Sequence, residues 1–134
     1  MADTQDYRRG RHVLSALHVH LVFVTTYRRD VLNGDHIGYL RGVFASVCED
    51  FGAHLVECDG EDDHVHLLVE YPTTVAVSAL VNALKGVSAR RLRQQYRVRT
   101  YREHLWSPSY FAASCGGAPL AIIRQYVENQ RTPD

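Results

Sequence analysis

The segment HLVECDGEDDHVHLLVEYP, residues 54–72, decides the predicted fold. Residues 54–58 and 64–71 each have the pattern of a β-strand, because Val65, Leu67 and Val69 alternate with polar or smaller positions. The connector, residues 59–63, contains an Asp-Gly pair that is typical of tight turns. The segment therefore predicts an antiparallel hairpin with one apolar face.

Five further elements are predicted around this hairpin from apolar spacing and from capping or breaking residues. Gly52 is expected to close the first helix, and Thr73 or Thr74 to cap the second. Pro108 marks an edge position or a bulge in the last strand, and Pro119 opens the last helix. The elements are a strand at 17–26, a helix at 35–51, a helix at 75–95, a strand at 106–114 and a helix at 119–130.

The element order is strand, helix, strand, strand, helix, strand, helix. This order predicts an α+β, ferredoxin-like (RRM-like) antiparallel sheet with an added C-terminal helix, in a single domain over residues 1–134. The helices are expected to cover one face of the sheet and to leave the other face free. A nucleic acid could lie along such a free face.

Charge is segregated along a chain whose net charge is zero. Residues 71–102 contain no Asp or Glu but many arginines, a distribution that can bind phosphate, although a solvated helix face would look the same. The buried stripe of helix 75–95 is expected to exclude Ser88 and the basic residues. The predicted DNA contacts are Lys85, Arg90 and Arg93 on that helix and Arg28 and Arg29 after the first strand.

No apolar run is long enough to cross a membrane, and the polar first residues do not resemble a signal peptide. We therefore expect a cytoplasmic protein, associated with the nucleoid when it is bound to DNA. Three cysteines without CxxC spacing are expected to be reduced and structural: Cys48, Cys58 and Cys115.

Two His-Val-His triplets are candidate metal-binding pairs, because residues i and i+2 on a strand point to the same face. His64 and His66 directly follow three acids, which can hydrogen-bond to imidazole N–H groups. His18 and His20 lie within a strand without adjacent carboxylates. The sequence favours the second pair, although solvated or core histidines would give the same pattern.

Tyr126 and Gln130 share one face of the last predicted helix, because they are four residues apart. The Gln130 amide oxygen suits a hard cation, and Tyr126 offers a phenol as a nucleophile. An aromatic residue at this spacing is also common in a hydrophobic core.

Five motifs in order resemble the single-tyrosine HUH transposases of bacterial insertion sequences, the insertion-sequence-200 and -605 type. They span most of the chain and are TTYRRDVL (25–32), DHVHLLVEYP (63–72), LVNALKGVSARRL (80–92), LWSPSYF (105–111) and YVENQ (126–130). The family often has Pro-Asp before the first metal histidine, whereas Asp62 and Asp63 stand there in this chain.

The resemblance implies a metal-dependent tyrosine transposase that cleaves and rejoins single-stranded DNA through a 5′-phosphotyrosine. It implies Mg²⁺ or Mn²⁺ on His64, His66 and Gln130, with Tyr126 as the nucleophile. Family members are homodimers that bind hairpin ends, and in several the tyrosine helix completes the partner subunit's site. The alternatives are a domesticated palindrome-specific nuclease and a non-catalytic ferredoxin-like nucleic-acid binder.

Overall fold

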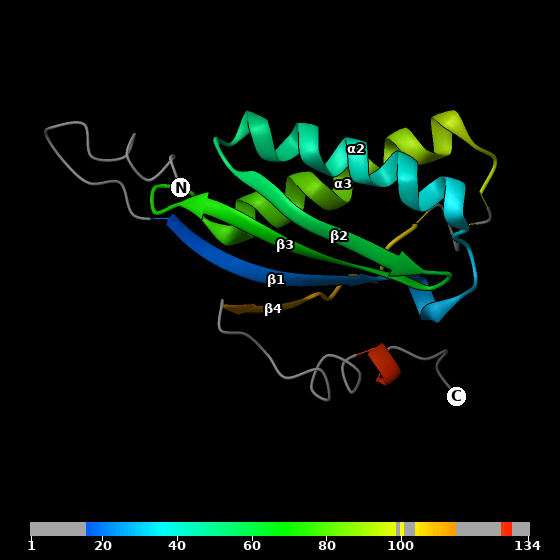
Figure 1. Cartoon of the computed structure of the whole chain (residues 1–134). Helices are drawn as coiled ribbons and strands as arrows, with labels where there is room; N and C mark the ends of the chain where they lie inside the picture. The colour runs from blue at the N-terminus through cyan, green and yellow to red at the C-terminus, as the bar shows by residue number, and fades with distance from the viewer. Residues whose placement is uncertain (1–15, 99, 101–103, 115–126, 130–134) are drawn as a thin grey trace, which may run out of the picture.

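The computed structural model describes residues 16–98, 100, 104–114 and 127–129. Within these ranges the chain order is β1 (Ala16–Val24), η1 (Thr26–Arg28), α2 (Gly34–Asp50), β2 (His54–Glu61), β3 (His64–Pro72), α3 (Val77–Gln95) and β4 (Phe111–Ser114). The predicted C-terminal helix falls almost entirely outside them. Its residues 127 and 128 are helical (Figure 1).

The described strands form one antiparallel sheet in the order β2-β3-β1-β4. β1 and β3 pair along their whole length, from Ala16 opposite Pro72 to Val24 opposite His64. Figure 1 shows α2 and α3 together on one side of the sheet and the helical turn at 127–129 on the other. The predicted ferredoxin-like arrangement with helices on one face is confirmed.

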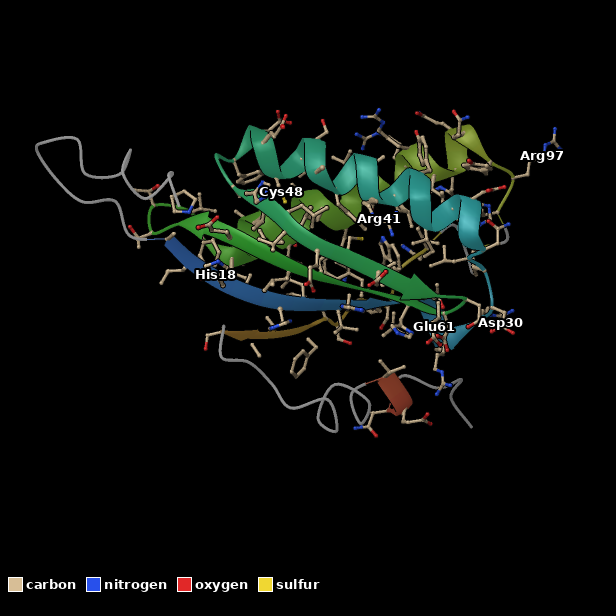
Figure 2. The ribbon with its side chains drawn as sticks, in the orientation of Figure 1. His18, Asp30, Arg41, Cys48, Glu61 and Arg97 are labelled. Atoms are coloured by element: carbon tan, nitrogen blue, oxygen red, sulfur yellow. The ribbon has the colours of Figure 1, made fainter. Side chains whose placement is uncertain are left out.

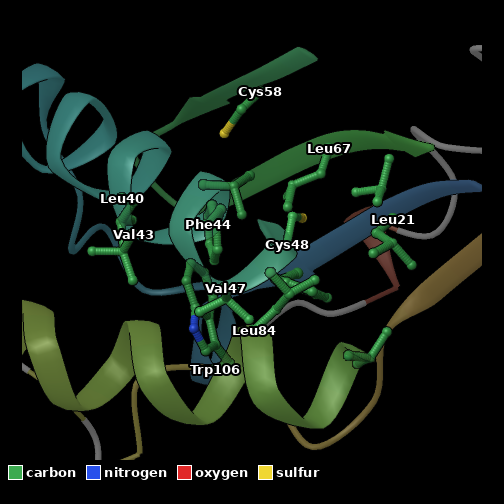
Figure 3. Packing of buried hydrophobic residues seen from close by; sticks show 14 of the residues in the cluster. Leu21, Leu40, Val43, Phe44, Val47, Cys48, Cys58, Leu67, Leu84 and Trp106 are labelled. Carbon is green, nitrogen blue, oxygen red and sulfur yellow. The ribbon is translucent and has the colours of Figure 1, made fainter. Parts of the chain in front are cut away.

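The main core lies between the sheet and the two helices, where alternate residues of β1 and β3 meet the apolar stripes of α2 and α3. Phe23 is fully buried in this core, and its ring centroid lies 6.0 Å from that of Phe44 and 5.8 Å from that of Trp106. Figure 3 shows Phe44 and Trp106 within the core. Buried apolar surface of this kind is the main favourable term in folding. Alternation in the sequence predicts inward positions at Leu17, Val19, Leu21 and Phe23 of β1 and at Val65, Leu67 and Val69 of β3. All of them are buried except Leu17, which is 44% exposed because it lies near the end of the strand.

Helix α2 begins where a side chain can satisfy its first amides. The Asn33 side chain accepts a hydrogen bond from the His36 amide, and His36 Nδ1 accepts one from the Asn33 amide, which completes a reciprocal cap. At the other end, Gly52 has a φ of 71°, as predicted for a residue that closes a helix. Helix α3 differs from its prediction, because it begins after Ala76 without a side-chain cap from Thr73 or Thr74.

The hairpin turn was predicted too early in the sequence. β2 continues through Asp59 and Gly60 to Glu61, and the turn consists of Asp62 and Asp63. A Cβ on Gly60 would lie 2.6 Å from the His64 carbonyl oxygen and 2.9 Å from the Ile37 side chain. Gly60 therefore permits close packing within the sheet and is not a turn residue.

The inner side of α3 is more polar than predicted. Ser88 is fully buried and accepts a 3.0 Å hydrogen bond from Trp106 Nε1. Lys85 is half-buried, and its Nζ donates to the carbonyl oxygens of Ser107, Pro108 and Ser109, at 2.7, 3.3 and 3.3 Å. These two residues face the segment 106–109 and were wrongly assigned to the outer side of the helix.

The last strand is also shorter than predicted. Trp106 forms an isolated bridge with Thr25, and regular pairing with β1 covers Phe111 to Ser114. Pro108 lies in the stretch that leaves the sheet, consistent with its lack of an N–H group for a ladder hydrogen bond.

The second face of the sheet is partly covered. Val22 and Val24 are fully buried there, and they form a small cluster with Val127 and Phe111. The prediction of a free face is therefore wrong at this end of the sheet, because the residues after the predicted nucleophile pack on it.

Two cysteines are buried and reduced, as predicted: Cys48 and Cys58. Burial raises the pKa of each thiol to about 11. Cys115 lies outside the described residues. In the part of the chain that the structure describes, neither helix is both long and apolar enough to cross a bilayer.

Candidate metal and DNA-cleavage site

His64 and His66 lie at the start of β3 on the face away from α2 and α3. Their register partners are Val24 and Val22 on β1. Residues directly opposite in an antiparallel sheet point to the same face, so both imidazoles share the face of the small cluster around Val127. Both side chains are partly exposed, which leaves them accessible from that face.

One of the three preceding acids makes the expected contact with an imidazole. His64 Nδ1 lies 2.9 Å from Asp63 Oδ1. Burial by itself would raise the pKa of Asp63, but its hydrogen bonds with His64 and Arg28 outweigh burial and hold that pKa below its ordinary value. An ionised carboxylate only accepts hydrogen bonds, so Nδ1 is the donor in this contact, and the neutral tautomer that fits it carries its lone pair on Nε2.

The loop after β1 fixes the backbone of this hairpin turn. The Thr25 amide donates to the Asp63 carbonyl oxygen at 2.9 Å, and the amides of Val31 and Leu32 donate to the Asp62 carbonyl oxygen at 3.0 and 2.9 Å. Thr25 is fully buried, and its hydroxyl donates to the Arg29 carbonyl oxygen at 2.7 Å. The position of His64 is thus set by a loop about 35 residues earlier in the chain.

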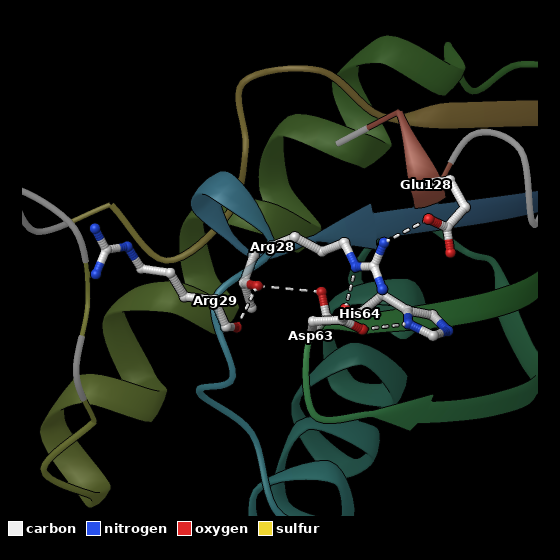
Figure 4. A network of polar contacts seen from close by, with 6 residues as sticks. Arg28, Arg29, Asp63, His64 and Glu128 are labelled. Carbon is white, nitrogen blue, oxygen red and sulfur yellow. Dashed lines mark hydrogen bonds and ion pairs between the residues drawn. The ribbon is translucent and has the colours of Figure 1, made fainter. Parts of the chain in front are cut away.

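Arg28 contacts acidic residues from two separate segments (Figure 4). Its Nε donates to Asp63 Oδ2, and its Nη1 lies 3.1 Å from Glu128 Oε1. The hydrogen bond to Asp63 raises the pKa of the guanidinium further, so Arg28 stays charged. It was predicted as a DNA contact, and the structure places it in this network beside the histidine pair.

These residues line a pocket of about 680 Å³. Its lining includes His64, His66 and Arg28, together with Val127 and Glu128 from the C-terminal segment. Tyr126 and Gln130, the predicted nucleophile and third ligand, lie outside the described residues. Their immediate neighbours in the sequence therefore adjoin the histidine pair within the same chain.

A cluster of three acids lies beside the pocket. Ligand oxygens of Asp30, Asp62 and Asp63 are all within 4.8 Å of one another. Burial raises the pKa of Asp62, and the negative charge of Asp30 raises it further. The oxygens of Asp63 are already shared between His64 and Arg28, so this residue supports the imidazole and is poorly placed to bind a cation directly.

The rival pair His18 and His20 lies further along the same face. The structure places Glu70 on the adjacent strand with Oε2 3.9 Å from His18 Nε2 (Figure 2 labels His18), so a carboxylate is closer than the sequence indicated. Within the described ranges, neither this pair nor His64 and His66 belongs to a set of three candidate ligand atoms, so that comparison favours neither pair. The structure therefore does not favour it over His64 and His66.

The predicted DNA contacts separate into two groups. Arg29, Arg90 and Arg93 are exposed, as phosphate contacts need to be. Lys85 is engaged with carbonyl oxygens, and desolvation lowers its pKa. Arg93 and Lys85 both line a smaller pocket of about 230 Å³ between α3 and residues 104–106.

Sequence reasoning missed Thr25 and Glu128. Thr25 begins a motif that carries the family resemblance, but its role depends on contacts 38 residues away. Glu128 is two residues beyond Tyr126, and its charge beside a candidate nucleophile is a signal that could have identified it.

Comparison with known proteins places the chain in a family. The family model of the IS200-like transposases matches residues 13–130. The ISDra2 transposase TnpA of Deinococcus radiodurans is 30% identical over 128 residues, which cover 93% of this chain and 91% of that protein. The transposase of insertion sequence element IS200 from Salmonella typhimurium is 27% identical over 118 residues, 86% of this chain and 77% of that protein.

Solved structures agree with the sequence comparisons. A crystal structure of a Deinococcus radiodurans protein assigned as a transposase has a TM-score of 0.80 and 29% identity, covering 94% of this chain and 99% of that one. The structure of a REP-associated tyrosine transposase bound to a REP hairpin has a TM-score of 0.57 over 88% of this chain and 67% of that one. At 14% identity the second likeness concerns the fold alone. On the family match over residues 13–130 and the relative with 30% identity, this chain belongs to the IS200-like transposase family.

Proposed function

We propose that this transposase cleaves and rejoins single-stranded DNA at insertion-sequence ends through a 5′-phosphotyrosine on Tyr126. His64, His66 and Gln130 would hold a Mg²⁺ or Mn²⁺ ion. The observation that supports the proposal is the 2.9 Å contact between His64 Nδ1 and Asp63 Oδ1, which in a neutral imidazole would leave the Nε2 lone pair for a cation on the face shared with His66. Simple DNA binding would not require this arrangement.

The chemistry is a phosphoryl exchange that balances without ATP or water. The Tyr126 oxygen attacks the scissile phosphorus, the bond to the 3′-oxygen breaks, and the phenolic proton ends on the new 3′-OH. Forming a phenolate at neutral pH would cost about 4 kcal/mol, because the free phenol has a pKa of ~10. A bound divalent cation would offset the charge that develops on the phosphate oxygens. Rejoining is the reverse reaction, with a 3′-OH attacking the phosphotyrosine.

DNA recognition is proposed to involve hairpin ends and the exposed arginines Arg29, Arg90 and Arg93. This role is supported by the solvent exposure and the positive charge of the three side chains. Hairpin ends are proposed from the family resemblance; the REP-associated transposase, which shares the fold, is itself bound to a REP hairpin. A homodimer is proposed from the family resemblance.

The proposed function is tested by incubating the protein with single-stranded hairpin DNA from the flanks of its own gene, together with Mn²⁺. Wild type is expected to form a covalent adduct that survives denaturing electrophoresis, and Tyr126→Phe to form none. His64→Ala and His66→Ala are expected to lose the adduct but to keep most hairpin binding. An undiminished adduct in Tyr126→Phe would exclude this tyrosine as the nucleophile.

A further inference from the structure

We propose that Arg28 is a positioning residue that joins the two halves of the cleavage site. One arm of its guanidinium holds Asp63, the hydrogen-bond partner of His64, and the other holds Glu128 in the segment after Tyr126. The inference rests on the proposed function, because it gives Arg28 a purpose in placing metal ligand and nucleophile relative to each other.

The first arm is shielded from solvent. Arg28 Nε donates to Asp63 Oδ2, while Oδ1 of the same carboxylate contacts His64 Nδ1. The Asp63 side chain is 9% exposed, so water and salt screen this pair weakly. Without Arg28, the carboxylate would lose a permanently charged partner, and its orientation towards the imidazole would be less defined.

The second arm reaches the C-terminal segment. Arg28 Nη1 lies 3.1 Å from Glu128 Oε1, and Val127 is buried against Val22 and Val24. An apolar contact and an ion pair thus hold the residues that follow Tyr126. The Glu128 side chain is 51% exposed, so this arm is the weaker of the two.

The backbone at Arg28 is specialised for this position. Tyr27 and Arg28 both have a φ of 56°, in the left-handed region that non-glycine residues rarely adopt. The Thr25 carbonyl oxygen accepts from the Arg28 amide at 2.7 Å and helps to hold this turn. Such backbone conformations persist where surrounding contacts enforce them, and they concentrate at functional sites.

Arginine suits the role better than lysine would. Its planar guanidinium has separate nitrogens, so Nε donates to Asp63 while Nη1 lies at ion-pair distance from Glu128, whereas an ammonium is a single nitrogen. Arg28→Lys therefore keeps the positive charge, and with it the general attraction to DNA, but loses the two-armed contact. Arg97→Lys is the matched control, at an exposed arginine beyond the end of α3 (Figure 2).

The first measurement is Mn²⁺ binding by DNA-free protein, followed through the electron paramagnetic resonance signal of free Mn²⁺. Arg28→Lys is expected to bind Mn²⁺ roughly 10-fold more weakly, the loss typical when an outer partner of a metal ligand is disturbed. Asp63→Asn should show a similar loss. Glu128→Gln and Arg97→Lys should bind Mn²⁺ as wild type does.

The second measurement is the rate of covalent adduct formation at saturating Mn²⁺ and saturating hairpin DNA. Arg28→Lys and Glu128→Gln should each slow the rate, and the double variant should be no slower than Arg28→Lys alone, because both changes break the same contact. A double variant whose loss is the product of the single losses contradicts the shared contact.

Three results would overturn the inference while the proposed function stands. One is that Arg28→Lys binds Mn²⁺ and forms the adduct as well as the unmutated protein does. Another is weaker hairpin binding with unchanged Mn²⁺ affinity, which would make Arg28 a DNA contact. The third applies if Arg28→Lys does not fold: Glu128→Gln then forms the adduct at the same rate as the unmutated protein. By contrast, if the unmutated protein binds Mn²⁺ but forms no covalent adduct, the proposed function is overturned. The Mn²⁺ affinities of Arg28→Lys and Asp63→Asn would still test whether Arg28 supports Asp63.

Discussion

Gly60 illustrates how one residue couples the packing of the sheet to the position of His64. A Cβ at this position would approach the His64 carbonyl oxygen to 2.6 Å and a Val65 methyl group to 2.9 Å. Backbone cannot retreat as a flexible side chain can, so β2 and β3 would have to separate locally. The close approach explains an Asp-Gly pair within a strand, where sequence statistics favour a turn.

We predict that Gly60→Ala destabilises the fold by about 1–3 kcal/mol, the usual cost of overpacking. Gly38→Ala is the control, because a Cβ on Gly38 in α2 would meet no neighbouring atom of the described residues within 4 Å, and alanine there should stabilise by about 0.5–1 kcal/mol. Urea denaturation measures both. Equal stability of wild type and Gly60→Ala would contradict the close packing.

At the scale of elements, α3 is anchored to the segment before β4 by polar contacts. Lys85 Nζ donates to three successive carbonyl oxygens, of Ser107, Pro108 and Ser109, and the Trp106 indole donates to Ser88. Pro108 interrupts the strand, so this stretch lacks sheet pairing and uses the lysine instead. Charge and position in the sequence cannot distinguish such a lysine from one that binds DNA.

Lys85→Met should therefore act on stability, and Arg93→Met on DNA binding. We expect Lys85→Met to cost about 1–3 kcal/mol, because it leaves carbonyl oxygens without their donor. Arg93 is exposed, so Arg93→Met should change stability by less than about 0.5 kcal/mol and should lower the salt dependence of hairpin binding by about one counterion. Denaturant titration and binding at several salt concentrations measure these effects. If Lys85→Met instead weakened hairpin binding without changing stability, Lys85 would again be assigned as a DNA contact.

At the scale of the whole molecule, the main core and the proposed cleavage site lie on opposite faces of the sheet. The main core is enclosed between the sheet and the two helices, whereas the histidine pair and its pocket adjoin the small cluster around Val127. Because this core consists of apolar side chains away from the histidine pair, we expect it to form without a metal ion, in contrast to small domains whose metal site replaces a core. We therefore expect changes at the proposed site to abolish cleavage without unfolding the protein.

We predict that the chelator EDTA leaves the thermal midpoint of purified protein unchanged. Added Mn²⁺ should raise it by the free energy RT ln(1 + [Mn²⁺]/Kd), about 2.7 kcal/mol at 100 times Kd. The variant His64→Ala/His66→Ala should keep the metal-free midpoint and lose the increase. Differential scanning calorimetry makes the comparison, and unfolding on chelation would show that the metal is part of the folded framework.

The sequence by itself determined the element order, the inward faces of β1 and β3, and the same-face histidine pair. These features follow from local periodicity, which needs no knowledge of distant residues. The family could also be identified from ordered motifs, and comparison confirmed it.

The tertiary structure decided which partners these residues have. It placed the turn at Asp62–Asp63, buried Val22 and Val24 beneath Val127, turned Lys85 inward, and brought Arg28 between Asp63 and Glu128. Each outcome depends on contacts between segments far apart in the chain, and hydrophobic periodicity does not predict such contacts. A charged residue in this sequence could be assigned to a face, but only the fold could show whether its partner is DNA or another side chain.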